Sequence, residues 1–336
     1  MTATTTNRRS LADLVDEVQG RVACLAMSKD PNAKVTVLLF SPGEPLPGRV
    51  AKVPTTDAAA ERVEAEARAL DFLAGHGPST LGGTVPRVVA HAEHRGRPVL
   101  VTTALPGRVM LASYHAWRHT ARPSLVRADF EAAGGWLAGL QEHASGATVD
   151  LARVLDGVAG TVGRRFGDDP WTAADLVHLA ALEGRLAGHP VTQVAVHGDF
   201  WPGNILLQDG RVRGVVDWES FQARGLPTRD LARFMVTYSL YLDRHTRTGR
   251  RVAGHPGLRS GPFGAGVIYA VDGTGWYPEL ARRFIGNGLR RLGLPPELGR
   301  DVVLAELAAI AAEADDPEFA KHHLVLFRHL CRATTP

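Results

Sequence analysis

Residues 194–221 read VAVHGDFWPGNILLQDGRVRGVVDWESF, and the rest of the chain is interpreted from this stretch. The runs VAVH and NILL are short and apolar, which predicts two buried strands. GVVDWESF predicts a further strand after the turn QDGRV. Four polar side chains stand among these strands and turns: His197, Asp199, Asn204 and Asp217.

The spacing of these side chains indicates a chemistry. In phosphoryl transfer, one carboxylate positions or deprotonates the attacking hydroxyl, while an amide oxygen and a second carboxylate hold Mg²⁺ on the nucleotide phosphates. Asp199 and Asn204 have the D-x-x-x-x-N spacing of a kinase catalytic loop, and His197 stands where that motif has its own His. Asp217, at a strand end, has the place of the metal-binding Asp. The alternative is a buried hairpin whose polar residues, with Pro202-Gly203, only make turns.

HGDFWPGNIL followed by VVDWE resembles the aminoglycoside phosphotransferase and choline kinase-like family, small-molecule kinases with a protein-kinase-like fold. The resemblance extends less sharply over residues 20–330. It implies an α+β, bilobal fold with a small β-rich N-lobe of five strands and one helix, and a larger, mainly helical C-lobe. We therefore predict an N-terminal nucleotide-binding lobe at 1–104, with 1–10 disordered, and a C-terminal catalytic and substrate-binding lobe at 105–336.

The first third of the chain has the pattern expected of such a small lobe. Strands are predicted at residues 21–27, 34–40 and 48–54. Residues 57–75 predict a helix that Asp57 can cap, with apolar residues at helical spacing. In the kinase arrangement, Lys52 on the third strand holds the α- and β-phosphates and pairs with a helix glutamate. Glu66 is preferred to Glu61 and Glu64, because the family pattern E-A-x-x-L-x-x-L begins at Glu66.

Two further nucleotide contacts follow from the resemblance. The turn SKDPNA, residues 28–33, would cover the phosphates but has no glycine, whereas protein kinases use glycine there so that the backbone can approach phosphate. Ser28, or the backbone around it, is the expected substitute. Residues 97–107 resemble the segment that leads into the hinge, so backbone groups around Thr103 and Ala104 are the expected adenine contacts. An ordinary strand end would have the same sequence.

The resemblance also assigns roles within the large lobe. Asp199 would accept or orient the proton of the acceptor hydroxyl, and Asn204 and Asp217 would hold Mg²⁺. His197 would brace the loop through hydrogen bonds and would not be the base. Asp230, in RDLARF, would cap or brace the helix behind the catalytic loop.

The acceptor is expected to be a small molecule, because the segment from Asp217 to Asp230 is short and has no A-P-E motif. The resemblance favours aminoglycosides and other hydroxylated antibiotics as acceptors. Choline-like amino alcohols, homoserine-like amino acids and sugars are the alternative acceptors. Residues 243–276 are Gly-rich and basic, which favours either a cap over an anionic acceptor or a mobile, solvated insertion. Aminoglycosides are polycations, so a basic insertion argues against them.

Composition bounds the remaining alternatives. A net charge of +3 is too small to indicate nucleic-acid binding. The two cysteines, Cys24 and Cys331, have no metal-ligand spacing, and residues 1–10 have no apolar run typical of a secretory signal. No apolar run reaches the length of a membrane span.

We therefore expect a cytoplasmic kinase that uses ATP and Mg²⁺, with a small hydroxylated acceptor and neither nucleic acid nor membrane as partner. A nucleotidyl transferase and a non-catalytic nucleotide-binding regulator are the alternatives on the same fold. The sequence leaves open ATP against GTP, resistance against metabolism, and the oligomeric state.

Overall fold

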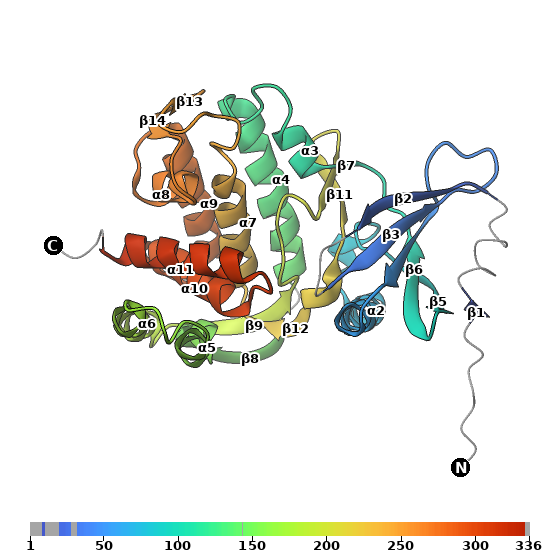
Figure 1. Ribbon diagram of the computed structural model, residues 1–336, viewed down its shortest axis with the longest axis horizontal. Coiled ribbons are helices and arrows are strands. Elements are labelled where there is room, and N and C mark those ends of the chain that lie inside the picture. Colours follow the sequence, from blue (N-terminus) through green and yellow to red (C-terminus); the bar gives the residue numbers. More distant parts are fainter. Residues whose placement is uncertain (1–8, 11–19, 28–31, 143, 333–336) are drawn as a thin grey trace, which may run out of the picture.

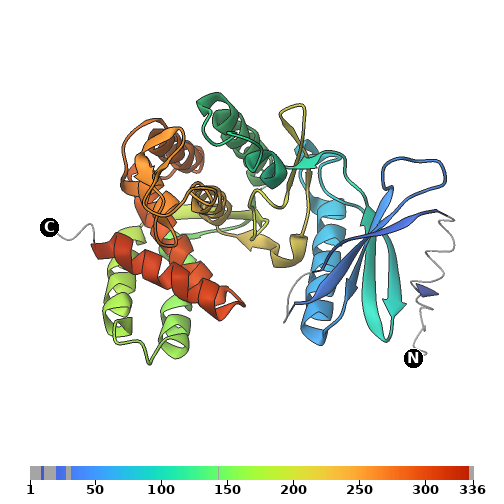
Figure 2. The same ribbon diagram turned by 45° about the horizontal axis from the view of Figure 1, so that its top comes forward.

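The computed structural model describes residues 9–10, 20–27, 32–142 and 144–332. It confirms the expected two-lobed architecture, with a small lobe built on one sheet and a larger lobe made mainly of helices (Figure 1). The two lobes lie side by side in both views, and the chain passes from the sheet of the small lobe into the large one after β6 (Figure 2). None of the described helices is both long enough and apolar enough to cross a bilayer.

The small lobe contains a six-stranded sheet of order β1-β5-β6-β4-β3-β2. Its strands are β1 (Arg9–Ser10), β2 (Val22–Met27), β3 (Lys34–Leu39), β4 (Arg49–Pro54), β5 (Val88–His94) and β6 (Arg97–Thr103). We expected five strands, and the sixth is the two-residue β1, which runs parallel to β5. This strand takes in two residues of the segment 1–10, which we expected to be disordered. Residues 1–8 of that segment, and Ser28, lie outside the described residues.

The helix of the small lobe, α2 (Asp57–His76), presents an apolar face to the sheet and the large lobe. Thr56 caps it, because its extended backbone lets Oγ1 accept a hydrogen bond from the Ala59 N–H at 3.1 Å. The expectation that Asp57 is the cap is wrong. Asp57 is already helical, and its carboxylate instead accepts a hydrogen bond from Arg97 Nε at 3.1 Å.

The large lobe contains most of the described helices and three small sheets. Its helices are α3 (Met110–Tyr114), α4 (Pro123–Gln141), α5 (Val158–Arg165), α6 (Thr172–Leu186), α7 (Thr228–Leu240), α8 (Ala265–Asp272), α9 (Trp276–Arg291), α10 (Gly299–Glu313) and α11 (Pro317–Arg332). Its strands are β7 (Arg108–Val109), β8 (Ala144–Asp150), β9 (Pro190–Val196), β10 (Ile205–Gln208), β11 (Arg211–Val215), β12 (Gln222–Gly225), β13 (Arg251–Val252) and β14 (His255–Arg259). Short 3₁₀ turns complete it: η2 (Leu151–Leu155), η3 (Trp218–Ser220) and η4 (Pro296–Leu298). A further one, η1 (Ser79–Leu81), lies between α2 and β5 in the small lobe.

Two small sheets of the large lobe position the motif residues. One has the order β11-β10-β7 and the other β12-β9-β8. A single apolar cluster joins α2 to the helices that surround these sheets. The catalytic-loop segment between β9 and β10 is therefore fixed at both ends by paired strands.

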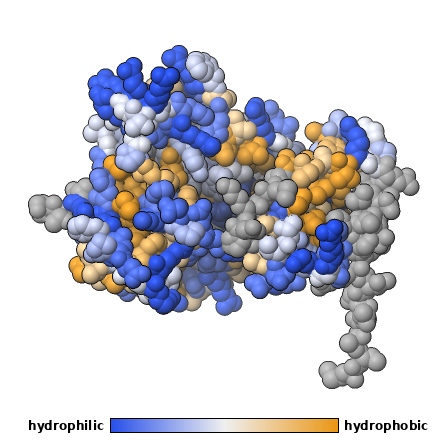
Figure 3. All heavy atoms as spheres, in the orientation of Figure 1, coloured by the Kyte–Doolittle hydropathy of each residue, from blue (hydrophilic) through white to orange (hydrophobic). Residues whose placement is uncertain are grey.

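The Gly-rich segment 243–276 is more regular than the expected insertion. It contains the antiparallel hairpin β13–β14 and the helix α8. Val252, Leu258 and Val267 are buried and anchor these elements in the core, which explains why the segment folds despite its glycines. The surface over β13 and β14 is mainly hydrophilic (Figure 3).

Candidate active site

The β10–β11 hairpin and the turn after it position Asp217. We expected the strand to reach this residue, but β11 begins earlier, at Arg211, and ends at Val215. Asp217 follows it in a left-handed conformation, with φ of 70° and ψ of 62°. A non-glycine residue in this region is uncommon and strained, and such strain is found mainly at functional sites. The next residue, Trp218, is buried and donates its indole N–H to Val215 O at 2.9 Å, which fixes the turn.

His197 and Asp230 hold the loop that contains Asp199. His197 is buried, its Nε2 lies 3.0 Å from Val216 O, and its Nδ1 lies 3.2 Å from the Asp199 N–H. This pair of contacts assigns the ring proton to Nε2, because Nδ1 must accept. From the first turn of α7, Asp230 accepts the backbone N–H groups of His197 at 2.7 Å and Gly198 at 2.9 Å.

Gly198 is required at this position for two reasons. Its φ is +84°, and a Cβ added to it would lie 2.1 Å from Ser220 O. The loop therefore packs directly against the η3 turn.

Burial raises the pKa of Asp230, and the hydrogen bonds that its carboxylate accepts from the loop act in the opposite direction.

Asn204 fixes the Asp199 side chain. The Asn204 amide Nδ2 donates to Asp199 O at 3.0 Å and to Asp199 Oδ2 at 3.2 Å. The other carboxylate oxygen, Oδ1, lies 3.6 Å from Arg233 Nη1, and about a third of the Asp199 side chain is exposed. Asp199 is therefore oriented by its neighbours and still accessible from the cleft.

Lys52 joins the two lobes electrostatically. Its Nζ contacts both Glu66 oxygens, at 2.7 and 2.5 Å, and lies 2.7 Å from Asp217 Oδ1. Glu66 is the glutamate of α2 that faces inward, whereas Glu61 and Glu64 are exposed. Burial alone would lower the pKa of Lys52, but the charges of Asp217 and Glu66 raise it above its ordinary value.

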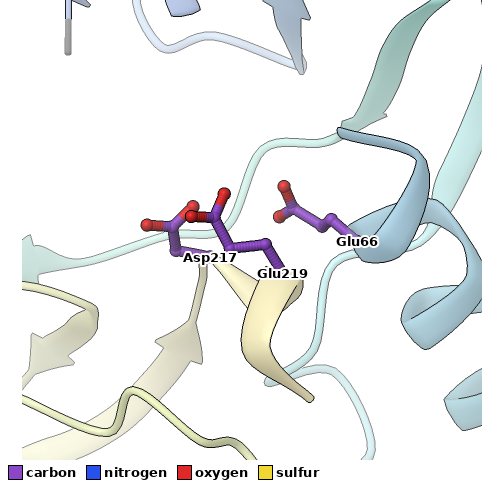
Figure 4. A group of neighbouring side chains, drawn as sticks. All are labelled: Glu66, Asp217 and Glu219. Atoms are coloured by element: carbon purple, nitrogen blue, oxygen red, sulfur yellow. The ribbon is translucent and has the colours of Figure 1, made fainter. Parts of the chain in front are cut away.

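Two further charged residues belong to the site, and neither was identified from the sequence. Lys34, at the start of β3, has its Nζ 3.2 Å from Asp217 Oδ1 and also contacts Glu219. One carboxylate oxygen from each of Glu66, Asp217 and Glu219 lies within 4.8 Å of the others, and Figure 4 shows Glu66 projecting from α2 toward the other two. Glu219 follows Asp217 by two residues in the quoted VVDWE, so that motif contained a signal. Lys34 had none.

The electrostatics of this cluster favour ionised Asp217. Burial would raise the pKa of Asp217, but the charges of Lys52 and Lys34 hold it well below the usual range. Burial and the neighbouring Asp217 charge raise the pKa of Glu219.

The donor chemistry fits a hard cation such as Mg²⁺, which prefers oxygen ligands. Both lysines contact the same Asp217 oxygen, Oδ1, so Oδ2 is the carboxylate atom left for a cation. The Asn204 amide directs its nitrogen at Asp199, so its oxygen is the atom left for a cation.

The backbone N–H groups at the expected adenine contacts are engaged within the protein. The Thr103 N–H donates to Arg87 O at 2.9 Å, and the Ala104 N–H donates to Gly48 O at 3.0 Å. Neither N–H is free to bind the edge of a purine in this arrangement. Ser28, the expected phosphate contact, lies outside the described residues.

A cavity of about 210 Å³ opens beside Asp199. Its walls come from the catalytic loop, from η3, from Arg62 on α2, from the first turns of α7, and from α10, α11 and the turn between them. A hydroxylated molecule in this cavity would therefore lie next to Asp199.

The fold and the comparisons together define a small-molecule phosphotransferase. Residues 43–261 match the family model of the phosphotransferase enzyme family, APH, and the chain belongs to that family. A comparison with curated protein sequences finds no match.

Several solved structures share the fold. The streptomycin–ATP–APH(2")-IIa ternary complex aligns with a TM-score of 0.55 at 16% identity, covering 98% of this chain and 97% of that one. A thermostable mutant of aminoglycoside phosphotransferase APH(4)-Ia, with ADP and hygromycin B, aligns with a TM-score of 0.60 at 13% identity, covering 97% and 98%. Macrolide 2'-phosphotransferase MphH from Brachybacterium faecium aligns with a TM-score of 0.56 at 17% identity, covering 94% and 98%.

Proposed function

We propose that the protein transfers the γ-phosphate of ATP to a hydroxyl group of a small hydroxylated antibiotic or metabolite. The observation that carries this proposal is the network in which Lys52 meets Glu66 and Asp217 beside a loop that orients Asp199. These are the groups that phosphoryl transfer needs, in the order and spacing of a kinase. An antibiotic acceptor would make this a resistance enzyme, and a metabolite would make it biosynthetic.

Each residue of the network has a proposed task. Asp199 accepts or orients the proton of the acceptor hydroxyl, while Lys52, oriented by Glu66, neutralises phosphate charge. Asn204 and Asp217 would hold Mg²⁺, which when bound neutralises charge on the phosphate oxygens.

The remaining sequence predictions complete this picture. His197 and Asp230 keep the loop in place through their hydrogen bonds. Backbone groups around Thr103 and Ala104 would receive the adenine edge, and Ser28 or the backbone around it would approach the phosphates. In this scheme residues 1–104 form the nucleotide-binding lobe and residues 105–336 the catalytic and acceptor-binding lobe.

The test is acceptor-dependent ADP release from Mg·ATP, measured across hydroxylated antibiotics, amino alcohols, sugars and amino acids. Asp199→Ala should abolish turnover while leaving ATP affinity largely intact, and Asp217→Ala should weaken Mg·ATP binding. Asp209→Asn is a matched control, because Asp209 is an exposed aspartate in the turn of the same hairpin and Asn tolerates its φ of +53°. Turnover by purified Asp199→Ala at the wild-type rate, or release of pyrophosphate in place of ADP, would contradict the proposal.

A further inference from the structure

The cavity beside Asp199 contains charges of both signs. Its acidic lining residues are Asp199, Glu219, Glu313 and Asp315, and its basic lining residues are Arg62, Arg229 and Arg233. A site that attracts a polycation usually has an excess of one sign, because the summed field then concentrates the ligand. The nearly equal numbers of acidic and basic side chains in this cavity therefore help to identify the class of acceptor.

Each acidic side chain of the cavity already has a basic partner. Glu313 contacts Arg229 from α7, and Glu219 contacts Lys34. Asp315 lies 3.7 Å from Arg62 and also accepts a 2.5 Å hydrogen bond from Asn32.

Asp199 itself faces Arg233, at 3.6 Å. Arg233 is fixed from behind, because its Nε lies 2.6 Å from an oxygen of Glu306, a carboxylate that is only 1% exposed. Arg233 would therefore lose its ion pair with a buried carboxylate if it turned away from the cavity.

The rest of the cavity favours an uncharged ligand. Ile310, Ala314 and Phe319 contribute apolar surface, and the Ser220 residue contributes to the polar rim. Hydroxyl groups can donate to the carboxylates and accept from the guanidinium groups, whereas an ammonium group can only donate. A lining that combines apolar surface with hydrogen-bond donors and acceptors suits a sugar-like ring, which has apolar faces and polar edges.

The size of the cavity is restricted by one of these ion pairs. At about 210 Å³ the cavity is smaller than the roughly 300–1,000 Å³ typical of sites for drug-sized ligands. Arg229 and Glu313 line both this cavity and an adjacent one of about 270 Å³, so their contact stands between the two.

We infer that the acceptor is a small polyhydroxylated molecule without net positive charge, and that Arg62 and Arg229 select against polycations. This inference rests on the proposed function. A polycation would have to displace arginines from the Asp315 and Glu313 carboxylates, and its ammonium groups would then lie beside those arginines. Like charges placed together in this way are a common source of discrimination.

The experiment compares acceptors that differ in charge. A neutral sugar, the same sugar with one amino group in place of a hydroxyl, and an aminoglycoside are compared by kcat/KM for ADP release. We expect kcat/KM to fall in that order. Arg62→Gln and Arg229→Gln remove the arginine partners of Asp315 and Glu313. In each variant the ratio of aminoglycoside to neutral-sugar kcat/KM should rise roughly tenfold. Arg185→Gln is the matched control, because Arg185 pairs with Asp301 of α10 at 2.9 Å outside the cavity.

Binding provides a readout that does not depend on turnover. Calorimetric titration of each acceptor into Asp199→Ala with Mg·ATP should show the same order of affinities, with the neutral sugar tightest. An aminoglycoside that binds wild type and Asp199→Ala most tightly, or no change of ratio in either arginine variant, would overturn the inference. If the aminoglycoside is also the best substrate and its turnover requires Asp199, the proposed function stands and only the inference fails. If acceptors bind in the expected order but none yields ADP, the proposed function fails and the inference about binding stands.

Discussion

Replacing Lys52 by methionine tests whether the cluster between the lobes is an electrostatic unit. The change keeps an unbranched, apolar side chain one atom shorter than lysine, and it removes the charge that contacts Glu66 at 2.5 Å and Asp217 at 2.7 Å. Removing one partner of a buried ion pair costs about 3–5 kcal/mol, mostly because the other charge stays buried and unpaired. Asp217 keeps its contact with Lys34, so Glu66, whose side chain is 3% exposed, bears most of this cost. We therefore expect Lys52→Met to lower the free energy of unfolding by about 3 kcal/mol.

The double variant Lys52→Met/Glu66→Gln separates stability from catalysis. It contains no unpaired buried charge at this position, so we expect it to regain about 1–2 kcal/mol of the loss. It should not regain turnover, because the lysine proposed to neutralise phosphate charge is absent in both variants. Lys321→Met, at an exposed lysine of α11, is the control and should change stability by no more than about 0.5 kcal/mol.

The measurements are urea unfolding, analysed at matched m-values, and coupled ADP release at saturating acceptor. The single variant Glu66→Gln is measured as well. If the losses of unfolding free energy in Lys52→Met and Glu66→Gln add up to the loss in the double variant, Lys52 and Glu66 are not energetically coupled. Wild-type turnover in the double variant would refute the proposed role of Lys52 at the phosphates.

Three further predictions concern single residues. Thr56→Ala should lower the free energy of unfolding by about 1 kcal/mol and Asp57→Ala by much less, because Thr56 makes the cap contact; urea unfolding that ranks them in reverse would contradict this. Asp230→Asn should reduce kcat and cost about 1–3 kcal/mol of stability, because an amide nitrogen would face a backbone N–H; an unchanged kcat would exclude a positioning role. Burial lowers the pKa of His255 from 6.5 to about 4, so the unfolded chain takes up the proton first and stability should fall as the pH drops through this range. His255→Gln should remove up to about 3 kcal/mol of that pH dependence in unfolding measured from pH 7 to 4, and equal slopes would refute the assignment.

The parts of the site that are close in sequence could be predicted from the sequence. The four polar residues of the quoted stretch lie within one short segment, so the spacing of the motif alone brought them together. The Lys52–Glu66 contact joins neighbouring elements of one lobe. The order strand, lysine, helix, glutamate indicated such a pair, and the family pattern beginning at Glu66 selected this glutamate over Glu61 and Glu64.

The residues that were missed depend on the packing of distant segments. Lys34 is 183 residues from Asp217, and Arg233 reaches Asp199 only because α7 packs behind the catalytic loop. No local pattern reports such contacts, because they are set by how the two lobes and their helices come together. The cap of α2 was missed by one residue for a different reason. Thr56 and Asp57 are both good capping residues, and only the backbone conformation decides between them.

Asp217 combines the two most costly features of the site, a strained backbone and a largely enclosed charge. Its left-handed conformation is held by the neighbouring Val216 N–H, which donates to Asn204 O at 3.0 Å, and by the buried Trp218. Its charge is held by Lys34 from β3 and Lys52 from β4, which belong to the other lobe. Because backbone and charge are fixed from different lobes, a rearrangement that separates the lobes would remove the charge partners but not the turn. The Asp217 geometry is therefore a property of the large lobe, while its low pKa is a property of the contact between the lobes.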